Sequence, residues 1–255
     1  MGDLLYSADF ECTLDDKDLL IAELWERGCR GITELSDSFL RAFFDEIPDS
    51  FRDADWEPVE EQDWIAYART MLEPMLVGER FFLVPEWRDD PAPPGRFRIV
   101  VNPGMAFGTG FHETTQLCIE ALERRVKPGM SVLDVGTGSG ILAEAARLLG
   151  AGRVIGCDID REAVEIAGLR IPAFLGSADA VASSSAELVV ANITPGALVK
   201  LTPDILRVLR PGGVALLSGF EVEDAPFAGL PLYTKGDWGL LEYFGDRHDG
   251  DVLRP

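Results

Sequence analysis

The strongest indication of the fold is the segment Val132-Leu133-Asp134-Val135-Gly136-Thr137-Gly138-Ser139-Gly140-Ile141. Its first four residues predict an apolar strand, which leads into a glycine-rich turn and then into an alanine-rich helix. Unhindered backbone N–H groups and a helix N-terminus therefore face a ligand beyond the end of the strand. A dinucleotide-binding turn would place its glycines as G-x-G-x-x-G, whereas here Ile141 stands where the third glycine should be.

Downstream of this turn, buried strands alternate with helices. We expect strands over 132–135, 154–158, 188–191 and 214–217, helices over 141–149, 161–167 and 197–209, and two last strands over 232–235 and 238–244. Residues 221–230 are too rich in Pro and Gly for a helix. The pattern predicts an α/β fold: a doubly wound, Rossmann-like parallel sheet of about seven strands, covered on both faces, with ligands bound outside the carboxyl ends of the strands.

Upstream of the turn, the chain predicts a smaller α+β unit and a connection. A strand over 4–12, a helix over 15–27 stopped by Gly28, and strands over 31–35 and 39–44 make up the first part. A helical stretch around 63–67, a strand over 81–84 and a breaker-rich loop over 89–95 follow. We therefore expect a small acidic α+β domain over 1–60, a linker helix and connection over 61–95, and the doubly wound domain over 96–255.

The charge of the chain limits its partners. The formal net charge of −21 would repel a phosphate backbone, which argues against direct binding of nucleic acid. Residues 1–63 hold 19 Asp and Glu against 5 Lys and Arg, so two thirds of the excess lies in a quarter of the chain. This acidic segment is either a solvated, solubilising surface or a docking surface for a basic protein.

Composition excludes several other classes. With 255 residues, 47% of them hydrophobic and 26% charged, the chain has the make-up of a globular protein rather than of a disordered one. No apolar run approaches the roughly 18–20 residues that span a bilayer, so we expect a cytoplasmic protein without a membrane segment. The scattered cysteines and the two histidines suggest neither a disulfide framework nor a metal site, and we interpret the cysteines as reduced packing residues.

Asp158 is the candidate ribose ligand. It ends the strand that follows the glycine turn, about twenty residues on, where a carboxylate can accept both ribose hydroxyls. Asp160, two residues later, is best interpreted as the N-cap of the next helix. Asp179 lies in the segment Gly176-Ser177-Ala178-Asp179-Ala180, before the strand over 188–191. It is either an acceptor for an adenine amino group or a carboxylate of a surface loop.

Two further segments carry a specific resemblance. They are Asn102-Pro103-Gly104-Met105-Ala106-Phe107-Gly108-Thr109-Gly110-Phe111-His112-Glu113-Thr114-Thr115 and Val190-Ala191-Asn192-Ile193. With Asp134 and the G-x-G-x-G turn, they resemble the ribosomal protein L11 methyltransferases, the PrmA family, from about Glu60 to the end of the chain. The resemblance implies S-adenosylmethionine as the cofactor, bound by Thr115, Gly136, Asp158 and Asn192, to which we add Gly138 of the same turn.

The residues of these segments also make chemical sense. The glycines and hydroxyls of 105–115 suit a lid that folds over a cofactor, although a tight structural loop would show the same composition. In this segment His112 is a general base or, by preference, a capping residue. The amide oxygen of Asn192 can accept a hydrogen bond from a neutral amine and aim its lone pair, so Asn192 is the candidate catalytic residue; otherwise it is a turn-forming residue before Thr194-Pro195-Gly196.

The resemblance implies an S-adenosylmethionine-dependent protein N-methyltransferase that modifies amino groups, of lysine or an N-terminus, on the large-subunit ribosomal protein L11, itself a basic protein. The chain departs from the family by being short between Asp158 and Asn192, and its first 60 residues resemble the family's substrate-recognition domain only loosely. These departures do not affect the expected cofactor ligands, but they affect the identity of the substrate. The alternatives are a methyltransferase for another protein or a small amine, and a non-catalytic cofactor-binding relative.

Overall fold

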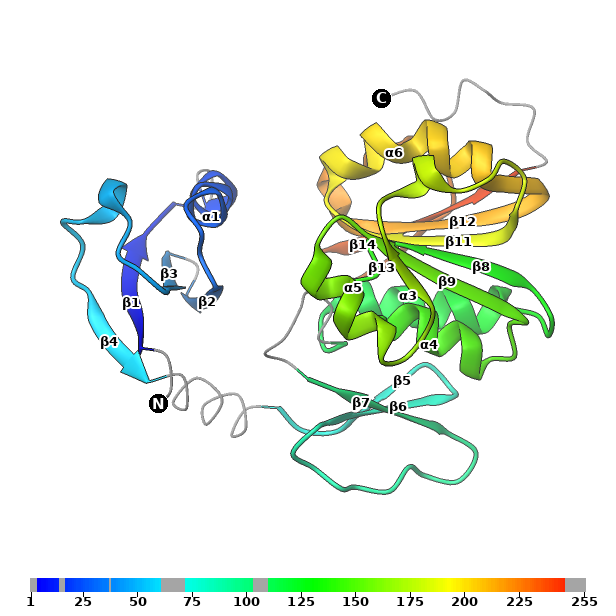
Figure 1. The fold of residues 1–255 in the computed structure, drawn as a ribbon, viewed down its shortest axis with the longest axis horizontal. Helices are drawn as coiled ribbons and strands as arrows, with labels where there is room; N and C mark the ends of the chain where they lie inside the picture. Colours follow the sequence, from blue (N-terminus) through cyan, green and yellow to red (C-terminus); the bar gives the residue numbers. More distant parts are fainter. Residues whose placement is uncertain (1–3, 14–16, 37, 61–71, 103–109, 246–255) are drawn as a thin grey trace. The chain divides into compact units, whose positions relative to one another are not determined.

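The protein forms two compact units, Met1–Leu72 and Glu73–Pro255, in a computed structural model that describes residues 4–13, 17–36, 38–60, 72–102 and 110–245 (Figure 1). The helix expected around 63–67 and the first five residues of the expected lid, 105–109, lie outside the described residues. No described helix is both long and apolar enough to cross a membrane.

The first unit is a four-stranded antiparallel sheet with a helix on one face. Its elements are β1 (Leu4–Glu11), α1 (Lys17–Glu26), β2 (Gly31–Ser36), β3 (Phe39–Phe44), the short 3-10 helix η1 (Asp49–Phe51) and β4 (Glu57–Glu60), and the strand order is β2-β3-β1-β4. The first four elements match the expected ones within a few residues; β4 was not expected. Leu24 of α1 packs against Leu40 and Phe44 of β3, so the helix buries the apolar face of the sheet.

The second unit opens with a small sheet of three strands, β5 (Met75–Val77), β6 (Phe81–Pro85) and β7 (Phe97–Val101). β6 pairs antiparallel with β5 and parallel with β7. Two of these strands lie inside the segment 61–95 that we expected to connect the domains, and they belong to the second unit. The Glu123 carboxylate holds the β5–β6 turn by accepting hydrogen bonds from the backbone N–H groups of Glu79 and Arg80, at 2.9 and 2.8 Å.

A seven-stranded sheet forms the body of the second unit, which confirms the doubly wound α/β prediction. Its strands are β8 (Ser131–Val135), β9 (Arg153–Asp158), β10 (Ala173–Leu175), β11 (Ala186–Asn192), β12 (Leu209–Glu221), β13 (Leu232–Lys235) and β14 (Trp238–Phe244), in the order β10-β9-β8-β11-β12-β14-β13. The sheet is mixed rather than wholly parallel, because β14 runs antiparallel to both β12 and β13. Only Gly236 and Asp237 separate β13 from β14, and a two-residue connection can join only antiparallel strands.

Helices cover both faces of this sheet. α3 (Glu113–Arg125), α4 (Ile141–Leu148) and α5 (Arg161–Gly168) lie on one face, and α6 (Pro195–Val208) lies on the other (Figure 1). Neighbouring strand residues alternate between the two cores: Val132 packs with the first set of helices and Leu133 with α6. Two expected caps are present, since His112 and Asp160 each accept a hydrogen bond at the N-terminus of α3 and α5, respectively. The four cysteines are buried and form no disulfide, as expected.

Candidate active site

The carboxyl ends of three adjacent strands bring the predicted site residues together. The chain leaves β8, builds β9 and β10 on one side of it, and then crosses back to build β11 on the other side. Doubly wound sheets bind their ligands at such a reversal, between the loops that follow the two strands, here β8 and β11. Asp158 ends β9 and Asn192 ends β11, on either side of the glycine turn that follows β8.

The glycine turn takes a backbone shape that other residues cannot adopt without strain. Gly136, Gly138 and Gly140 have φ angles of +69°, +51° and +78°, in the left-handed region. A Cβ atom on Gly136 would collide with the Ile193 side chain, and one on Gly140 would lie 3.1 Å from the Ala167 Cα. The turn therefore needs glycine for its conformation at all three positions and for space at two of them.

Asp158 is hydrogen-bonded to the glycine turn. Its Oδ2 accepts from the backbone N–H of Gly138 at 2.9 Å, and its Oδ1 accepts from the N–H of Asp160 at 3.0 Å. A carboxylate has about four lone-pair sites, so each oxygen keeps capacity for one more donor. The half-buried side chain is thus oriented and still able to accept two hydroxyl groups from a ligand.

Asp134 lies beneath the turn and is fully buried. Its Oδ2 accepts hydrogen bonds from the Thr137 hydroxyl at 2.7 Å and from the Ala143 backbone N–H at 3.1 Å. Its Oδ1 has no hydrogen-bond partner among the residues that the structure describes. Burial raises the pKa of Asp134 to about 7, because the charged form is poorly solvated there.

Asn192 and Thr115 meet although they are far apart in the sequence. The Asn192 Nδ2 donates to the Thr115 hydroxyl oxygen at 3.4 Å. Thr115 lies in the first turn of α3 and is only 1% exposed, whereas Asn192 is half-buried. With its nitrogen directed at Thr115, the Asn192 amide can use its oxygen to accept a hydrogen bond from a second group.

The end of the predicted lid forms the entry to α3. Gly110 has a φ of +77°, and a Cβ there would come within 2.7 Å of the Ile141 Cδ1 atom. His112 caps α3 through Nδ1, which accepts from the Thr114 N–H at 3.3 Å, and its ring meets Trp238 edge-on at 4.5 Å. These contacts agree with the preferred interpretation of His112 as a capping residue.

Two further residues, Asp179 and Ile159, belong to the edge of the sheet formed by the carboxyl ends of its strands. Asp179 is exposed in the short 3-10 helix η2 (Ala178–Ala180), and both of its interpretations stay open. Ile159 was not singled out from the sequence, yet its side chain is 84% exposed directly after Asp158. An apolar residue between two acids, in Asp158-Ile159-Asp160, is the signal that could have identified it, because a flat apolar ligand group would cover such a side chain.

Comparisons with known proteins agree on one family. Residues 41–225 match the sequence profile described as ribosomal protein L11 methyltransferase (PrmA). Proteins of that name from Symbiobacterium thermophilum and Burkholderia cenocepacia are 45% and 46% identical over 168 and 172 residues, which cover 63% and 66% of this chain and 55% and 57% of theirs. The chain thus spans little more than half the length of these curated relatives.

A solved structure extends the likeness to three dimensions. The ribosomal protein L11 methylase of Lactobacillus delbrueckii subsp. bulgaricus is 32% identical and superposes with a TM-score of 0.60. The match covers 67% of this chain and 97% of that structure.

Proposed function

Since this chain belongs to the ribosomal protein L11 methyltransferase (PrmA) family, we propose that it transfers methyl groups from S-adenosylmethionine to amino groups of a large-subunit ribosomal protein, L11. The observation that carries the proposal is the hydrogen bond between Asp158 and Gly138, which joins a carboxylate to a glycine turn at the reversal point of the sheet. A ribosomal protein is made in the cytoplasm, so the proposal places the enzyme there.

The described residues fit this cofactor. Asp158 keeps an acceptor site on each oxygen for the two ribose hydroxyls. The glycine turn follows β8 at the reversal point of the sheet, which is where doubly wound folds bind their ligands. The exposed Ile159 offers an apolar surface for the adenine ring, and we propose Asp179, exposed in η2, as the acceptor of its amino group. Thr115, Gly136, Gly138, Asp158 and Asn192 therefore remain the proposed cofactor ligands.

The bound cofactor supplies a methyl group on a sulfonium, which is already a good leaving group. The protein then has to position an unprotonated amine in line with the methyl group and exclude water. A lysine needs the most help, since bringing a pKa near 10.4 to neutrality takes about 4.6 kcal/mol, whereas an α-amino group near 7.7 takes about 1 kcal/mol.

Asn192 is the residue that we propose to orient the amine. Its Nδ2 is engaged by Thr115, so its Oδ1 is the atom available to accept an N–H from a neutral amine. An amide cannot remove a proton at neutral pH, and its role is therefore to aim the lone pair of the nucleophile rather than to act as a base. Thr115 supports this role by holding the amide in one orientation.

Isothermal calorimetry tests the cofactor assignment. S-adenosylmethionine and its product S-adenosylhomocysteine should bind with dissociation constants of micromolar order, and NAD should not bind. Asp158→Ala should weaken binding by about 2 kcal/mol or more, roughly 30-fold, because two hydroxyls lose a charged acceptor. Asp160→Ala is the matched control: it removes the cap of α5, and we expect it to lower stability while leaving affinity within a few-fold. NAD binding in place of S-adenosylmethionine would refute the methyltransferase proposal.

Methyl transfer tests the substrate. Purified L11, incubated with the enzyme and S-adenosylmethionine carrying a labelled methyl group, should acquire label that mass spectrometry places on amino groups. Cofactor binding with no label on L11 would favour another protein or a small amine as the substrate. Cofactor binding with no transfer to any amine in a cell extract would favour a non-catalytic relative.

A further inference from the structure

The loop between β10 and β11, residues 176–185, begins beside the proposed ribose ligand. Leu175, the last residue of β10, pairs with Asp158, and the backbone N–H of Gly176 donates to the Asp158 carbonyl oxygen at 2.8 Å. The loop then forms η2, in which Ala178 is fully buried in the same core as Cys157. The 176–185 loop is thus part of the edge that carries the site.

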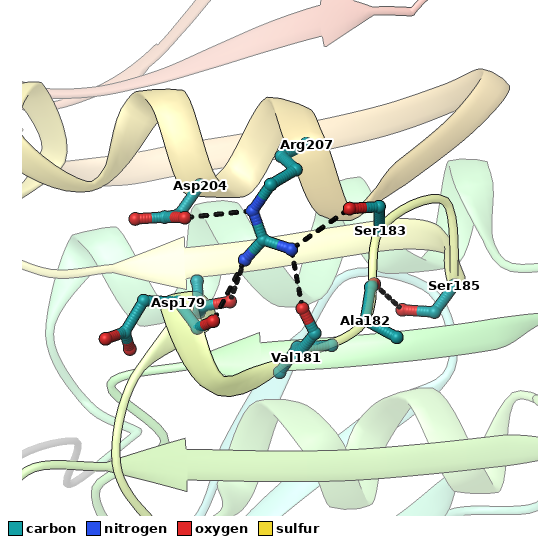
Figure 2. A network of polar contacts seen from close by, with 8 residues as sticks. Asp179, Val181, Ala182, Ser183, Ser185, Asp204 and Arg207 are labelled. Carbon is teal, nitrogen blue, oxygen red and sulfur yellow. Dashed lines mark hydrogen bonds and ion pairs between the residues drawn. The ribbon is translucent and has the colours of Figure 1, made fainter.

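Arg207 of α6 holds this loop through its backbone (Figure 2). Its Nη2 donates to the carbonyl oxygens of Ala178 and Asp179, at 2.9 and 3.2 Å, and its Nη1 donates to that of Val181 at 2.7 Å. Nη1 also lies 3.3 Å from the Ser183 hydroxyl oxygen. The remaining donor, Nε, contacts Asp204 one turn earlier in α6, at 3.0 Å, which fixes the direction of the guanidinium group.

The contacts of Arg207 depend on the shape of the guanidinium group. The planar fork presents its donors in fixed directions, so one side chain can satisfy several carbonyl groups that no strand partner reaches. Beyond the bond of Gly176, the described contacts show few other hydrogen bonds of the loop. They are two bonds within the 3-10 turn, one from the Ser185 hydroxyl to Ala182, backbone bonds from Ser184 and Ser185 to the end of α6, and one from the Arg210 Nε to the Ser184 carbonyl oxygen at 3.3 Å. Without the guanidinium, the centre of the loop would keep the apolar packing of Ala178 and Val181 in the core that α6 shares, but it would lose its hydrogen bonds to α6.

The orientation that we propose for the bound cofactor brings its adenine base near the 176–185 loop. In S-adenosylmethionine the sulfonium and the base are attached to opposite sides of the ribose. If the ribose binds Asp158 on β9 and the methyl group faces Asn192 on β11, the base points away from β11, toward β10 and the loop that follows it. Asp179, whose carbonyl oxygen Arg207 contacts, stands in that loop.

We propose that Arg207 is a positioning residue for the adenine end of the cofactor: by holding the carbonyl groups of Ala178, Asp179 and Val181, it keeps the 176–185 loop in the one shape that receives the base. This inference rests on the proposed function, because it takes S-adenosylmethionine as the ligand. A preorganised loop binds its ligand without losing further conformational freedom. Releasing the loop should therefore weaken binding of the cofactor and lower the selectivity for adenine over other bases.

The test compares base selectivity in matched variants. Calorimetry gives dissociation constants for S-adenosylhomocysteine and for S-inosylhomocysteine, which has an oxo group in place of the adenine amino group. Arg207→Met is the test variant. Arg96→Met is the control, because Arg96 also donates to two backbone carbonyl groups of a turn, those of Gly78 and Phe81, in the small β5–β6–β7 sheet.

Arg207→Met should bind S-adenosylhomocysteine about tenfold more weakly, and its preference over S-inosylhomocysteine should fall by a factor of about five. Arg96→Met should keep both values within about twofold of the wild type. If Arg207→Met does not fold, Arg207→Lys, which keeps the charge but loses the fork, carries the same test with a smaller change expected. Equal selectivity in the wild type, the folded Arg207 variant and Arg96→Met would overturn the inference and leave the proposed function standing. Failure of the wild type to bind S-adenosylhomocysteine would overturn both.

Discussion

The carboxyl group of Asp134 is buried at a cost to folding. Its Oδ2 accepts two hydrogen bonds, from Thr137 and Ala143, while its Oδ1 has no partner in the described part of the chain. These two bonds join β8, the glycine turn and α4, and burial nevertheless raises the pKa of the group to about 7. A polar group kept in such surroundings is a sign of function rather than of stability.

The stability of the protein should therefore depend on pH through Asp134. In the unfolded chain the carboxyl group ionises near pH 3.9, and in the folded chain near pH 7. Between these values the unfolded state releases the proton first, so the free energy of unfolding falls as pH rises from about 4 to about 7, and this contribution stays constant above that.

Asp134→Asn should remove this fall. Relative to the wild type, its free energy of unfolding should rise by on the order of 2–4 kcal/mol between pH 4 and pH 8, because its side chain does not ionise. Urea denaturation of both proteins at the two pH values measures the difference. Carboxylates whose pKa is lowered, such as Asp9 beside Arg41, oppose the trend equally in both proteins and cancel. Parallel pH profiles for wild type and variant would show that Asp134 does not titrate in this range.

Asn192 should act on turnover more than on binding. Asn192→Ala should lower kcat by about a hundredfold, since a misdirected nucleophile loses alignment at the transition state. The thermal midpoint should stay near that of the wild type, and the dissociation constant of S-adenosylhomocysteine should change by only a few-fold. Thr115→Val, which removes the acceptor of the Asn192 amide, should lower kcat by about tenfold. A fully active Asn192→Ala would contradict the assignment.

At the scale of elements, α3 is joined to the last hairpin of the sheet by a buried carboxylate. Glu242 of β14 is 0% exposed and accepts from Arg124 and Arg125 in the last turn of α3. Each guanidinium also lies over an aromatic ring, that of Tyr233 or Phe244. The cluster fixes the helix whose first turn carries Thr115.

Neutralising Glu242 should destabilise the second unit. Glu242→Gln leaves two arginine charges without their counter-ion, and we expect a loss of about 2–3 kcal/mol in the free energy of unfolding. The control is Glu120→Gln, which removes the partly exposed pair between Glu120 and Lys235 that also joins α3 to this hairpin, and which should cost less than about 1 kcal/mol. Chemical denaturation compares them, and equal losses would mean that burial of Glu242 contributes nothing.

For the whole molecule, charge is unevenly divided. Residues 1–63 carry a net charge of −14 out of −21 for the chain. Several of these acids, including Glu46, Asp53 and Asp55, are exposed in the first unit. Such a surface would attract a basic ribosomal protein over a distance that salt controls, because the Debye length falls from about 10 Å at 0.1 M to about 3 Å at 1 M.

Neutralising these three residues together, to Gln, Asn and Asn, should raise the KM for L11 several-fold at low salt and leave kcat unchanged. The difference from the wild type should disappear near 1 M salt, where the charges are screened. A matched triple variant of exposed acids in the second unit, Glu79, Asp89 and Glu165, is the control. Equal effects of the two triple variants would favour the interpretation of a solvated, solubilising surface.

Local patterns predicted most of the elements but missed the strands β4, β5 and β7. The strand over 132–135 and the helix over 161–167 were recognised because their apolar residues follow a clear period. β4 contains Pro58, and β5 has three residues, so neither shows a pattern of its own. β4 forms because it pairs with the edge of β1, and β5 forms because it pairs with the edge of β6. A single sequence does not show which strands will pair.

The doubly wound class, the glycine turn and the identity of the candidate ligands could be predicted from the sequence, because they depend on residues that are neighbours along the chain. Three other features became visible only in the folded chain: β14 inserts antiparallel beside β12, Asn192 meets Thr115 across 77 positions, and Arg207 holds a loop 26 to 29 residues earlier. The tertiary structure also decided that the Oδ1 atom of Asp134 has no hydrogen-bond partner in the described part of the chain. These features come from packing and burial, in which each side chain responds to groups that the fold brings close and that sequence separation does not reveal.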